Sequence, residues 1–357
     1  TQVVNGSDLS GFDHEQMSTI PLTVRSGGTA TGLPLCPLLP WHLARFRPDV
    51  ILAEGNSNLL NNLLVFAYTS ISRTPVVFWT LVYLRQKGRP SRKQRLFRLI
   101  SRWMESRSAA LLGYSSLAID YFNRQGFPRE RQFRAVNCVD TDRVMARIEA
   151  ARGKTESLRN SLGLQGKRVL LYVGAITATK RLEDLVVVHA RLQKRDADLA
   201  LLIVGDGAYR QEIERFAVSQ GATDVIFAGR VVQDVSQYFL LGDIFVLPWL
   251  GGLAISEAMV HGLPVVVTEA DGCELDLVEH GKNGYVLPVG DCHSLEDCLA
   301  SMLNDPERLK SMGEHSRWII EHRYNIHTYM ENVVAALEYA YKGKRERRRT
   351  KEVGLSI

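Results

Sequence analysis

The sequence contains two adjacent glycines followed by a single acid, a pattern that could bind a phosphorylated ligand. Gly251 and Gly252 follow an apolar run at 244–248, and Glu257 comes five residues later in a stretch of helical character. The unpaired amides and positive end of a helix that begins there favour an anion, typically a phosphate. A carboxylate one turn further along can reach a neighbouring hydroxyl, such as that of a ribose. The same residues also fit a tight turn with ordinary compensation of the helix dipole, and the spacing alone favours neither interpretation.

The segments around these glycines predict a βαβ unit. Residues 244–248 are expected to form a buried strand, 253–261 a helix and 263–267 a second buried strand. This order is typical of a parallel sheet. Open α/β sheets bind ligands at the carboxyl ends of their strands, which is where the two glycines fall.

Strands and helices alternate through the second half of the chain. Predicted strands at 168–173, 199–204 and 225–228 are each followed directly by a glycine, with helices between them and after them near 294–303, 306–322 and 326–341. The first half shows the same alternation, with strands at 49–54, 75–79 and 109–114 and a turn-rich start in which 25–32 is interpreted as a loop. The polar stretch at 150–165 is the predicted boundary between two parallel α/β halves.

Composition restricts the class of protein. The 357 residues suffice for two domains, and 45% hydrophobic with 23% charged residues is typical of a soluble globular chain with a modest net charge of +5. No run reaches the roughly 18 apolar residues of a membrane span, and no signal peptide begins the sequence. The chain starts at Thr1, so we expect a first strand and its Gly-rich turn to be missing. Five scattered cysteines without metal-ligand spacing predict reduced thiols in a cytoplasmic protein: Cys36, Cys138, Cys273, Cys292 and Cys298.

A basic stretch interrupts the first half at 85–107. Its arginines alternate with apolar residues at helical spacing, so it predicts a basic amphipathic helix that contacts anionic lipid or an anionic acceptor. The candidate contact residues are Arg92, Arg95, Arg98 and Arg102. A solvated charged face over an ordinary core stripe is an equally good interpretation, and nucleic acid is disfavoured because no recognition motif accompanies the charge. The charge run at 342–351 is expected to be a disordered solvated end.

Six separated blocks, taken in order, resemble glycosyltransferase family 4. They are LLGYSSLAIDYFNRQGFPRERQFRAVNCVDTDR, YVGAITATKRLEDLV, LLIVGDGAYRQEIE, VIFAGRV, GDIFVLPW with GGLAISEAMVHGLPVVVT, and LVEHGKNGYVLPVGD. The resemblance covers roughly residues 45–341. It implies the α/β GT-B fold, in which two Rossmann-like, doubly wound parallel-sheet domains face a central cleft.

The resemblance also implies domain limits. Residues 1–155 would form the acceptor-side domain, without its first strand and loop, and 156–325 the donor-binding domain. A helix at 326–341 would return to the first domain, and 342–357 would be the basic tail.

The implied activity is that of a retaining hexosyltransferase. A bacterial member of this family would move a sugar from a UDP- or GDP-linked donor to a glycan or glycolipid acceptor in surface polysaccharide or lipopolysaccharide assembly. It would need no metal or other cofactor, bind no nucleic acid, and work in the cytoplasm, peripherally on the inner face of the plasma membrane. By resemblance Lys180 and Glu257 carry catalysis, neutralising the leaving diphosphate and holding the ribose. The donor-binding residues would be Gly174, Val231, Gly251, Gly252, Leu253, Ala254, Glu257 and Asp276.

Three departures from the family pattern keep a second hypothesis open. Trp249 stands where the family has the first of two glutamates, Ala175 replaces a common arginine, and no histidine occurs at 80–82. Glu274 either compensates for the missing acid or is a structural acid of its loop, and the second interpretation is favoured. The alternative function is a non-catalytic GT-B protein that binds a nucleotide sugar or assists assembly.

Overall fold

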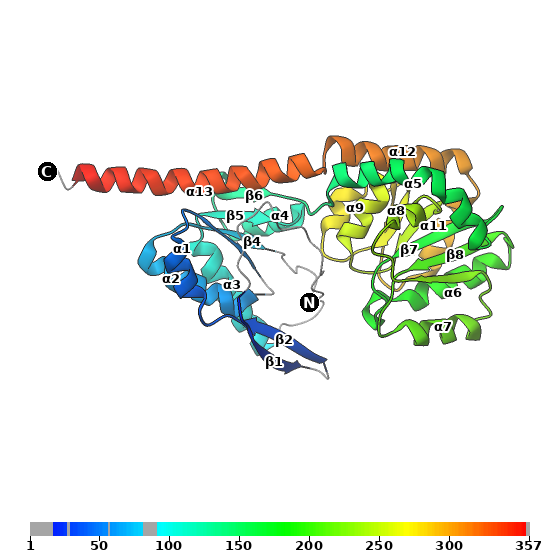
Figure 1. Cartoon of the computed structure of the whole chain (residues 1–357), viewed down its shortest axis with the longest axis horizontal. Helices are drawn as coiled ribbons and strands as arrows, with labels where there is room; N and C mark the ends of the chain where they lie inside the picture. Colours follow the sequence, from blue (N-terminus) through cyan, green and yellow to red (C-terminus); the bar gives the residue numbers. More distant parts are fainter. Residues whose placement is uncertain (1–16, 27–28, 56–57, 81–90, 355–357) are drawn as a thin grey trace. The chain divides into compact units, whose positions relative to one another are not determined.

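A computed structural model describes residues 17–26, 29–55, 58–80 and 91–354. The chain divides into two compact units, which are described separately here (Figure 1). Unit 1 comprises residues 1–80, 89–112 and 336–357, and unit 2 comprises 81–88 and 113–335. Residues 85–90 of the predicted basic stretch and the expected upstream strand lie outside the described residues.

Unit 1 is built on short parallel strands with flanking helices. Strand β3 (Ile51–Glu54) pairs in parallel with β4 (Val76–Thr80), and α2 (Leu59–Ser72) connects them. The sheet order is β3-β4-β5-β6, with β5 at Ala110–Gly113 and β6 at Gln132–Arg134; β6 falls within the residues of unit 2. Helices α1 (Leu39–Phe46) and α3 (Arg92–Arg107) complete the unit.

The loop predicted at 25–32 is wrong. An antiparallel hairpin takes its place, formed by β1 (Ile20–Ser26) and β2 (Thr29–Leu35). The threonines and the glycine that suggested a loop lie within β2, where Thr29 pairs with Ser26 and Gly32 with Thr23. Pairing across the hairpin overrides the weak strand preference of glycine.

Unit 2 contains a six-stranded parallel sheet. Its strands are β7 (Arg168–Val173), β8 (Leu199–Val204), β9 (Val225–Gly229), β10 (Ile244–Leu247), β11 (Val265–Thr268) and β12 (Gly284–Leu287). The order is β12-β11-β10-β7-β8-β9, so the chain builds outward from β7 in one direction and from β10 in the other. Strands β8, β10 and β11 are buried along their whole length, as expected of a sheet covered on both faces.

Helices cover both faces of this sheet. In Figure 1 the strands lie between α5 (Thr141–Ser161) and α12 (Pro306–His322) on one side and α6 (Leu182–Gln193) and α7 (Arg210–Ser219) on the other. Helix α11 (Cys292–Leu303) packs on α6, and α9 (Gly252–Val260) packs on α5 and α12. The shorter segments are α4 (Ser116–Arg124), α8 (Val235–Phe239), α10 (Cys273–Leu277) and the 3₁₀ turns Arg129–Arg131 and Ala178–Lys180. The predicted alternation of strands and helices is confirmed.

The boundary predicted at 150–165 is occupied by a helix instead of a linker. Helix α5 runs through most of it and buries Val144, Ile148 and Ala151 at helical spacing. The polar residues of this stretch cover the exposed side of that helix. The long segment of unit 2 runs from Gly113 to Ala335, whereas the predicted donor-binding domain spans 156–325.

The last helix, α13 (Ile326–Gly354), is longer than expected. Its residues from Ala336 onward belong to unit 1, and Lys344 pairs with Asp49 of that unit. The charge run predicted to be disordered at 342–351 is helical, and the helix continues to Gly354, because lysine, arginine and glutamate are good helix formers. Despite its 29 residues, neither α13 nor another helix in the described parts is long and apolar enough to cross a membrane.

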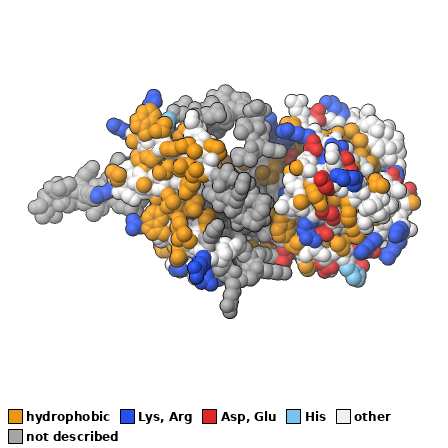
Figure 2. Space-filling model, turned by 90° about the horizontal axis from the view of Figure 1, so that it is seen from below, with side chains coloured by type: hydrophobic (Ala, Val, Ile, Leu, Met, Phe, Trp, Pro, Cys, Tyr) orange, Lys and Arg blue, Asp and Glu red, His pale blue; other side chains and the backbone are white. Residues whose placement is uncertain are grey.

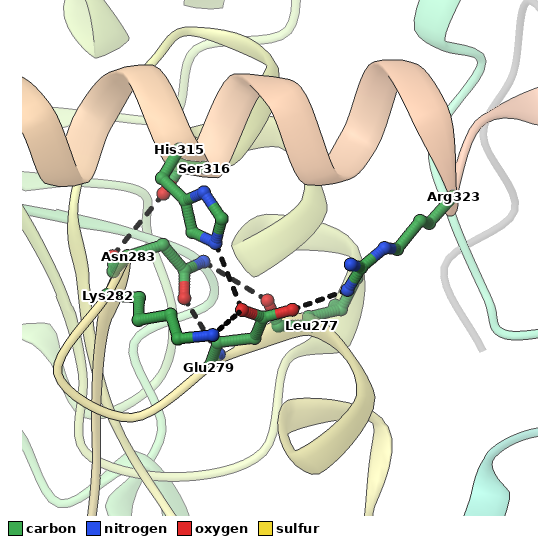
Figure 3. A network of polar contacts seen from close by, with 7 residues as sticks. All are labelled: Leu277, Glu279, Lys282, Asn283, His315, Ser316 and Arg323. Carbon is green, nitrogen blue, oxygen red and sulfur yellow. Dashed lines mark hydrogen bonds and ion pairs between the residues drawn. The ribbon is translucent and has the colours of Figure 1, made fainter.

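A network of polar contacts joins the segment between α10 and β12 to α12 (Figure 3). The Glu279 carboxylate accepts from His315 Nε2 at 3.0 Å and from Lys282 Nζ at 3.1 Å, and it pairs with Arg323. Asn283 closes the turn, because its Oδ1 accepts from the Glu279 amide and its Nδ2 donates to the Leu277 carbonyl. This network lowers the pKa of Glu279 to about 2, chiefly through the hydrogen bond from His315.

Candidate functional site

The residues predicted to bind a donor lie at the point where the strand order of unit 2 reverses. Strands β7 and β10 are neighbours there, and their helices leave toward opposite faces. Gly174 directly follows β7, and Gly251 and Gly252 lie between β10 and α9. Such a switch point is where doubly wound sheets bind ligands, because the connecting loops diverge and leave a crevice.

Close packing at the start of α9 requires a glycine. A Cβ atom on Gly252 would lie 2.4 Å from Cys273 Sγ and 3.1 Å from the Tyr114 hydroxyl. Leu253 is 47% exposed, whereas the Ala254 amide already donates to the Gly251 carbonyl at 3.0 Å. The start of the helix is therefore held against its neighbours, with its positive end at the edge of the sheet.

The loops after β7 and β8 also touch. A Cβ on Gly205 would lie 1.8 Å from the Gly174 carbonyl oxygen, so only glycine permits this approach. Val231 is half-buried beyond the end of β9 and packs against the core of unit 2. Gly174 and Val231 thus both lie beyond the carboxyl ends of their strands, as predicted.

Lys180 reaches the loop that precedes α9. It ends the 3₁₀ turn Ala178–Lys180, and its ammonium donates a hydrogen bond to the Leu250 carbonyl. Burial lowers the pKa of Lys180, and the nearby charge of Asp271 opposes that shift. A partly desolvated cation therefore lies at the same loop as the helix N-terminus, an arrangement that suits phosphate oxygens.

Glu257 lies in the second turn of α9. Its Oε1 is 3.6 Å from Arg147 Nη2 on α5 and has no hydrogen-bond partner although it is buried. Burial raises the pKa of this carboxyl, and the Arg147 charge opposes the rise. An unsatisfied buried acceptor is costly, so Glu257 is available to a hydroxyl donor.

Asp276 has two protein partners in the described structure. Its Oδ2 accepts from the Ser116 amide at 2.7 Å, and its Oδ1 pairs with Arg134 at 3.3 Å. Both oxygens hold α10 to the α4 and β6 segments of unit 2. In the described structure Asp276 thus joins these segments, and donor binding by Asp276 remains a prediction.

Glu274 stabilises its own loop, which agrees with the interpretation of this residue as a structural acid. Its two oxygens accept from the amides of Ala270 and Gly272 at 2.7 and 2.8 Å. Asp271, Cys273 and Glu274 bring potential metal-ligand atoms within 4.8 Å of one another. The chemistry does not suit a metal, because both Glu274 oxygens already accept amide hydrogen bonds and burial raises the pKa of the Cys273 thiol well above its ordinary value. That no metal takes part remains a prediction.

Sequence reasoning missed Arg147 and Tyr114. Arg147 lies 110 residues before Glu257, within the stretch next to the predicted linker, so no local pattern connected the two. Tyr114 accepts from Asn137 Nδ2 at 3.2 Å and lies against the start of α9. The buried spacing of Val144 and Ile148 was the available signal that α5 continues the fold and carries Arg147 to α9.

The predicted basic contact residues lie on α3 in unit 1. Arg92, Arg95, Arg98 and Arg102 are all exposed. Beside them Leu96 is 59%, Leu99 66% and Trp103 41% exposed. Figure 2 shows hydrophobic side chains gathered over the unit that carries α1, α2 and α3. The helix thus presents an apolar stripe flanked by arginines, while Met104 of the same helix is fully buried.

Known structures share this fold. The structure of Alr3699/HepE from Anabaena in complex with UDP superposes with a TM-score of 0.71 and 19% identity, over 85% of this chain and 82% of that one. The chain has the GT-B fold. The predicted fold class of two Rossmann-like parallel-sheet domains is thereby confirmed.

Sequence comparisons agree with the fold. Residues 154–318, a little under half of the chain, match the family described as "Glycosyl transferases group 1". The chain is 29% identical to alpha-D-kanosaminyltransferase of Streptomyces kanamyceticus over 64% of its length, and 28% identical to sulfoquinovosyl transferase SQD2 of Arabidopsis thaliana over 80%. It spans only 60% and 56% of these two proteins.

Proposed function

We propose that this chain transfers a sugar, with retention at the anomeric carbon, from a UDP- or GDP-linked donor to a glycan or glycolipid acceptor. The observation that carries the proposal is the position of the Lys180 ammonium at the loop before α9, with the unpartnered Glu257 oxygen in the second turn of that helix. A cation, a helix N-terminus and an open acceptor match the diphosphate and ribose of a nucleotide. The match of 154–318 to group 1 glycosyl transferases supports the same assignment.

The site suggests how the chain would assist the reaction. Negative charge develops on the diphosphate as the bond to the sugar breaks, and Lys180 with the first amides of α9 would stabilise it. Partial burial strengthens this effect, because fewer waters screen the ammonium. Glu257 would hold the ribose and so fix the distance between the nucleotide and the reacting carbon. On this proposal no metal is required for charge neutralisation.

Turnover of nucleotide sugars tests the proposal. We expect slow release of UDP or GDP from at least one member of a panel of UDP- and GDP-sugars, and faster release when a glycan or lipid-linked acceptor is added. Lys180→Ala and Glu257→Ala should each abolish this release. The control Lys194→Ala should not, because Lys194 is exposed at the C-terminal end of α6, whereas Lys180 precedes the N-terminal end of that helix. Nucleotide binding without release under any acceptor would instead support the non-catalytic hypothesis that Trp249 and Ala175 keep open.

We also propose that α3 binds to an anionic membrane surface. The enzyme would then be a peripheral membrane protein that acts in surface polysaccharide, lipopolysaccharide or glycolipid assembly. Exposed Leu96, Leu99 and Trp103 would enter the headgroup region, and the neighbouring arginines would contact lipid phosphates. Co-sedimentation with vesicles tests this: binding should rise with the fraction of phosphatidylglycerol and fall with salt. Equal binding to neutral phosphatidylcholine vesicles would contradict it.

A further inference from the structure

Four buried polar atoms without hydrogen-bond partners lie on α5, on α8, on α9 and at the residue that directly follows α9. They are Arg147 Nε, Ser236 Oγ, Glu257 Oε1 and His261 Nε2. Helix α5 packs on both α8 and α9. Buried polar atoms are nearly always paired in folded proteins, so such atoms mark a place that water or a ligand completes.

Contacts connect these atoms through Glu257. Its carboxylate is 3.6 Å from Arg147, and its backbone carbonyl lies 2.7 Å from His261 Nδ1. The His261 ring stacks on Phe239 of α8 with a centroid distance of 4.7 Å. Ser236 lies one turn before Phe239 on the same short helix. The three helices therefore bring one acid, one cation and one imidazole together.

The charges around Glu257 are few. Arg147 on α5 is its ion-pair partner, and α8 has no charged residue. On its own helix, His261 is kept neutral at physiological pH because burial lowers its pKa to about 4. Arg317 of α12 contributes positive charge at His261. Arg147 is thus the cation that acts directly on the Glu257 carboxylate.

The ionisation of Glu257 decides what it can bind. A carboxylate has two acceptor oxygens and can receive both hydroxyls of a ribose, whereas a protonated carboxyl uses one oxygen to carry a proton. Burial favours the protonated form, and a nearby opposite charge favours the carboxylate. At 3.6 Å the guanidinium supplies charge without a hydrogen bond, so Oε1 remains without a hydrogen-bond partner.

We propose that Arg147 is a positioning residue that keeps Glu257 ionised and open to the ribose hydroxyls of a nucleotide diphosphate. The inference rests on the proposed function, since it concerns the same site. Arg147 acts through Glu257 and does not itself need to touch the nucleotide. Its loss would shift the pH range over which the nucleotide binds, which loss of a merely structural contact would not do.

The experiment measures the affinity of the full chain for UDP and for GDP between pH 5 and 8.5 by titration calorimetry. An opposite charge at this separation lowers a carboxyl pKa by about 1–3 units, so Arg147→Met should move the pH at which affinity falls upward by at least about 1 unit. Arg147→Lys, which keeps the charge, should restore most of the wild-type profile. Weakening by the same factor at every pH in Arg147→Met would overturn the proposal.

Two control variants separate this effect from others. Arg152→Met removes the same charge from α5, but its partner Glu149 is at the surface and both side chains are more than half exposed, so the wild-type profile should remain. Glu257→Gln cannot titrate and should bind weakly, with only the pH dependence of the nucleotide itself. If Arg147→Met/Glu257→Gln retains the shifted profile, the titrating group is not Glu257 and the inference fails.

The wild-type chain also tests the inference if the Arg147 variants do not fold. Its affinity, divided by that of Glu257→Gln at each pH, should be constant from neutral to alkaline pH, because the guanidinium favours the ionised form of the acid. A rise that continues beyond pH 7 would show that Arg147 does not hold Glu257 ionised. Full affinity in Glu257→Gln at every pH would instead contradict the role of Glu257 in the proposed function itself.

Discussion

Among single residues, the proposed function depends most on Lys180. Its ammonium is partly desolvated and donates to a backbone carbonyl at the loop before α9, where a diphosphate would offer a far better acceptor.

Lys180→Ala should therefore weaken UDP or GDP binding by about 10- to 100-fold, since a hydrogen bond to a charged group is worth about 1.5–3 kcal/mol. The affinity for the nucleoside without phosphates should not change, because the lysine contacts only the diphosphate. Calorimetric titration of both ligands checks this. Equal losses for nucleoside and nucleotide would indicate a general defect of the fold.

A substitution at Gly252 tests how closely the start of α9 packs against Cys273. Gly252→Ala places a methyl 2.4 Å from Cys273 Sγ, and Cys273 is buried and cannot move aside freely. Overpacking of this kind costs about 1–3 kcal/mol, measured as the free energy of unfolding in urea. Adding Cys273→Ala should recover part of the loss, and Gly153→Ala on α5, where the new Cβ meets no atom within 4 Å, should stabilise the chain. Unchanged stability in Gly252→Ala would mean that the helix starts elsewhere.

At the scale of elements, the connection of the α10–β12 segment to α12 depends on one ionised acid. Hydrogen bonds depress the pKa of Glu279 to about 2, below its ordinary 4.5. The contribution of such a group is present above the ordinary pKa and is lost as the pH falls toward the depressed value.

Glu279→Gln should therefore destabilise the chain at pH 6–7, and its difference from wild type should shrink between about pH 4.5 and 2. Urea unfolding at several pH values measures the difference. Glu149→Gln, at an exposed ion pair, is the matched control and should change little at any pH. A difference that grows as the pH falls would contradict the assignment of the network to ionised Glu279.

The order of elements in unit 2 was predictable from sequence because each buried strand is a short apolar run that ends at a glycine. Strand β7 before Gly174 and β8 before Gly205 are examples. The helix α5 was not predictable as part of this unit, because its second half is polar and its four buried residues all lie in its first half. The sequence likewise indicated Glu257 but not Arg147, since nothing local shows that two helices far apart in the chain will meet. The contacts of Asp276 were not predictable either, because its partners, Ser116 and Arg134, come from another part of the chain.

At the scale of the whole molecule, the two proposed activities lie in different units. Every described contact of Lys180 and Glu257 comes from unit 2, whereas the exposed arginines and apolar side chains of α3 belong to unit 1. Charge on α3 should therefore affect association with a surface without altering the affinity for a small ligand.

The triple variant Arg95→Gln/Arg98→Gln/Arg102→Gln should lose most of its binding to anionic vesicles, because each basic residue near the surface contributes about 1 kcal/mol. Its affinity for UDP or GDP should equal that of wild type, and Lys180→Ala should show the reverse pattern. Co-sedimentation and calorimetry on the same preparations measure the two properties. Joint loss of both properties in the triple variant would show that the units do not act separately.

The most direct test of the account is a crystal structure of the chain with UDP or GDP bound. We predict the diphosphate against the first amides of α9, with Lys180 Nζ at hydrogen-bond distance from a phosphate oxygen and the ribose hydroxyls on the Glu257 carboxylate. A nucleotide bound elsewhere, or bound with Lys180 and Glu257 both out of contact, would contradict it.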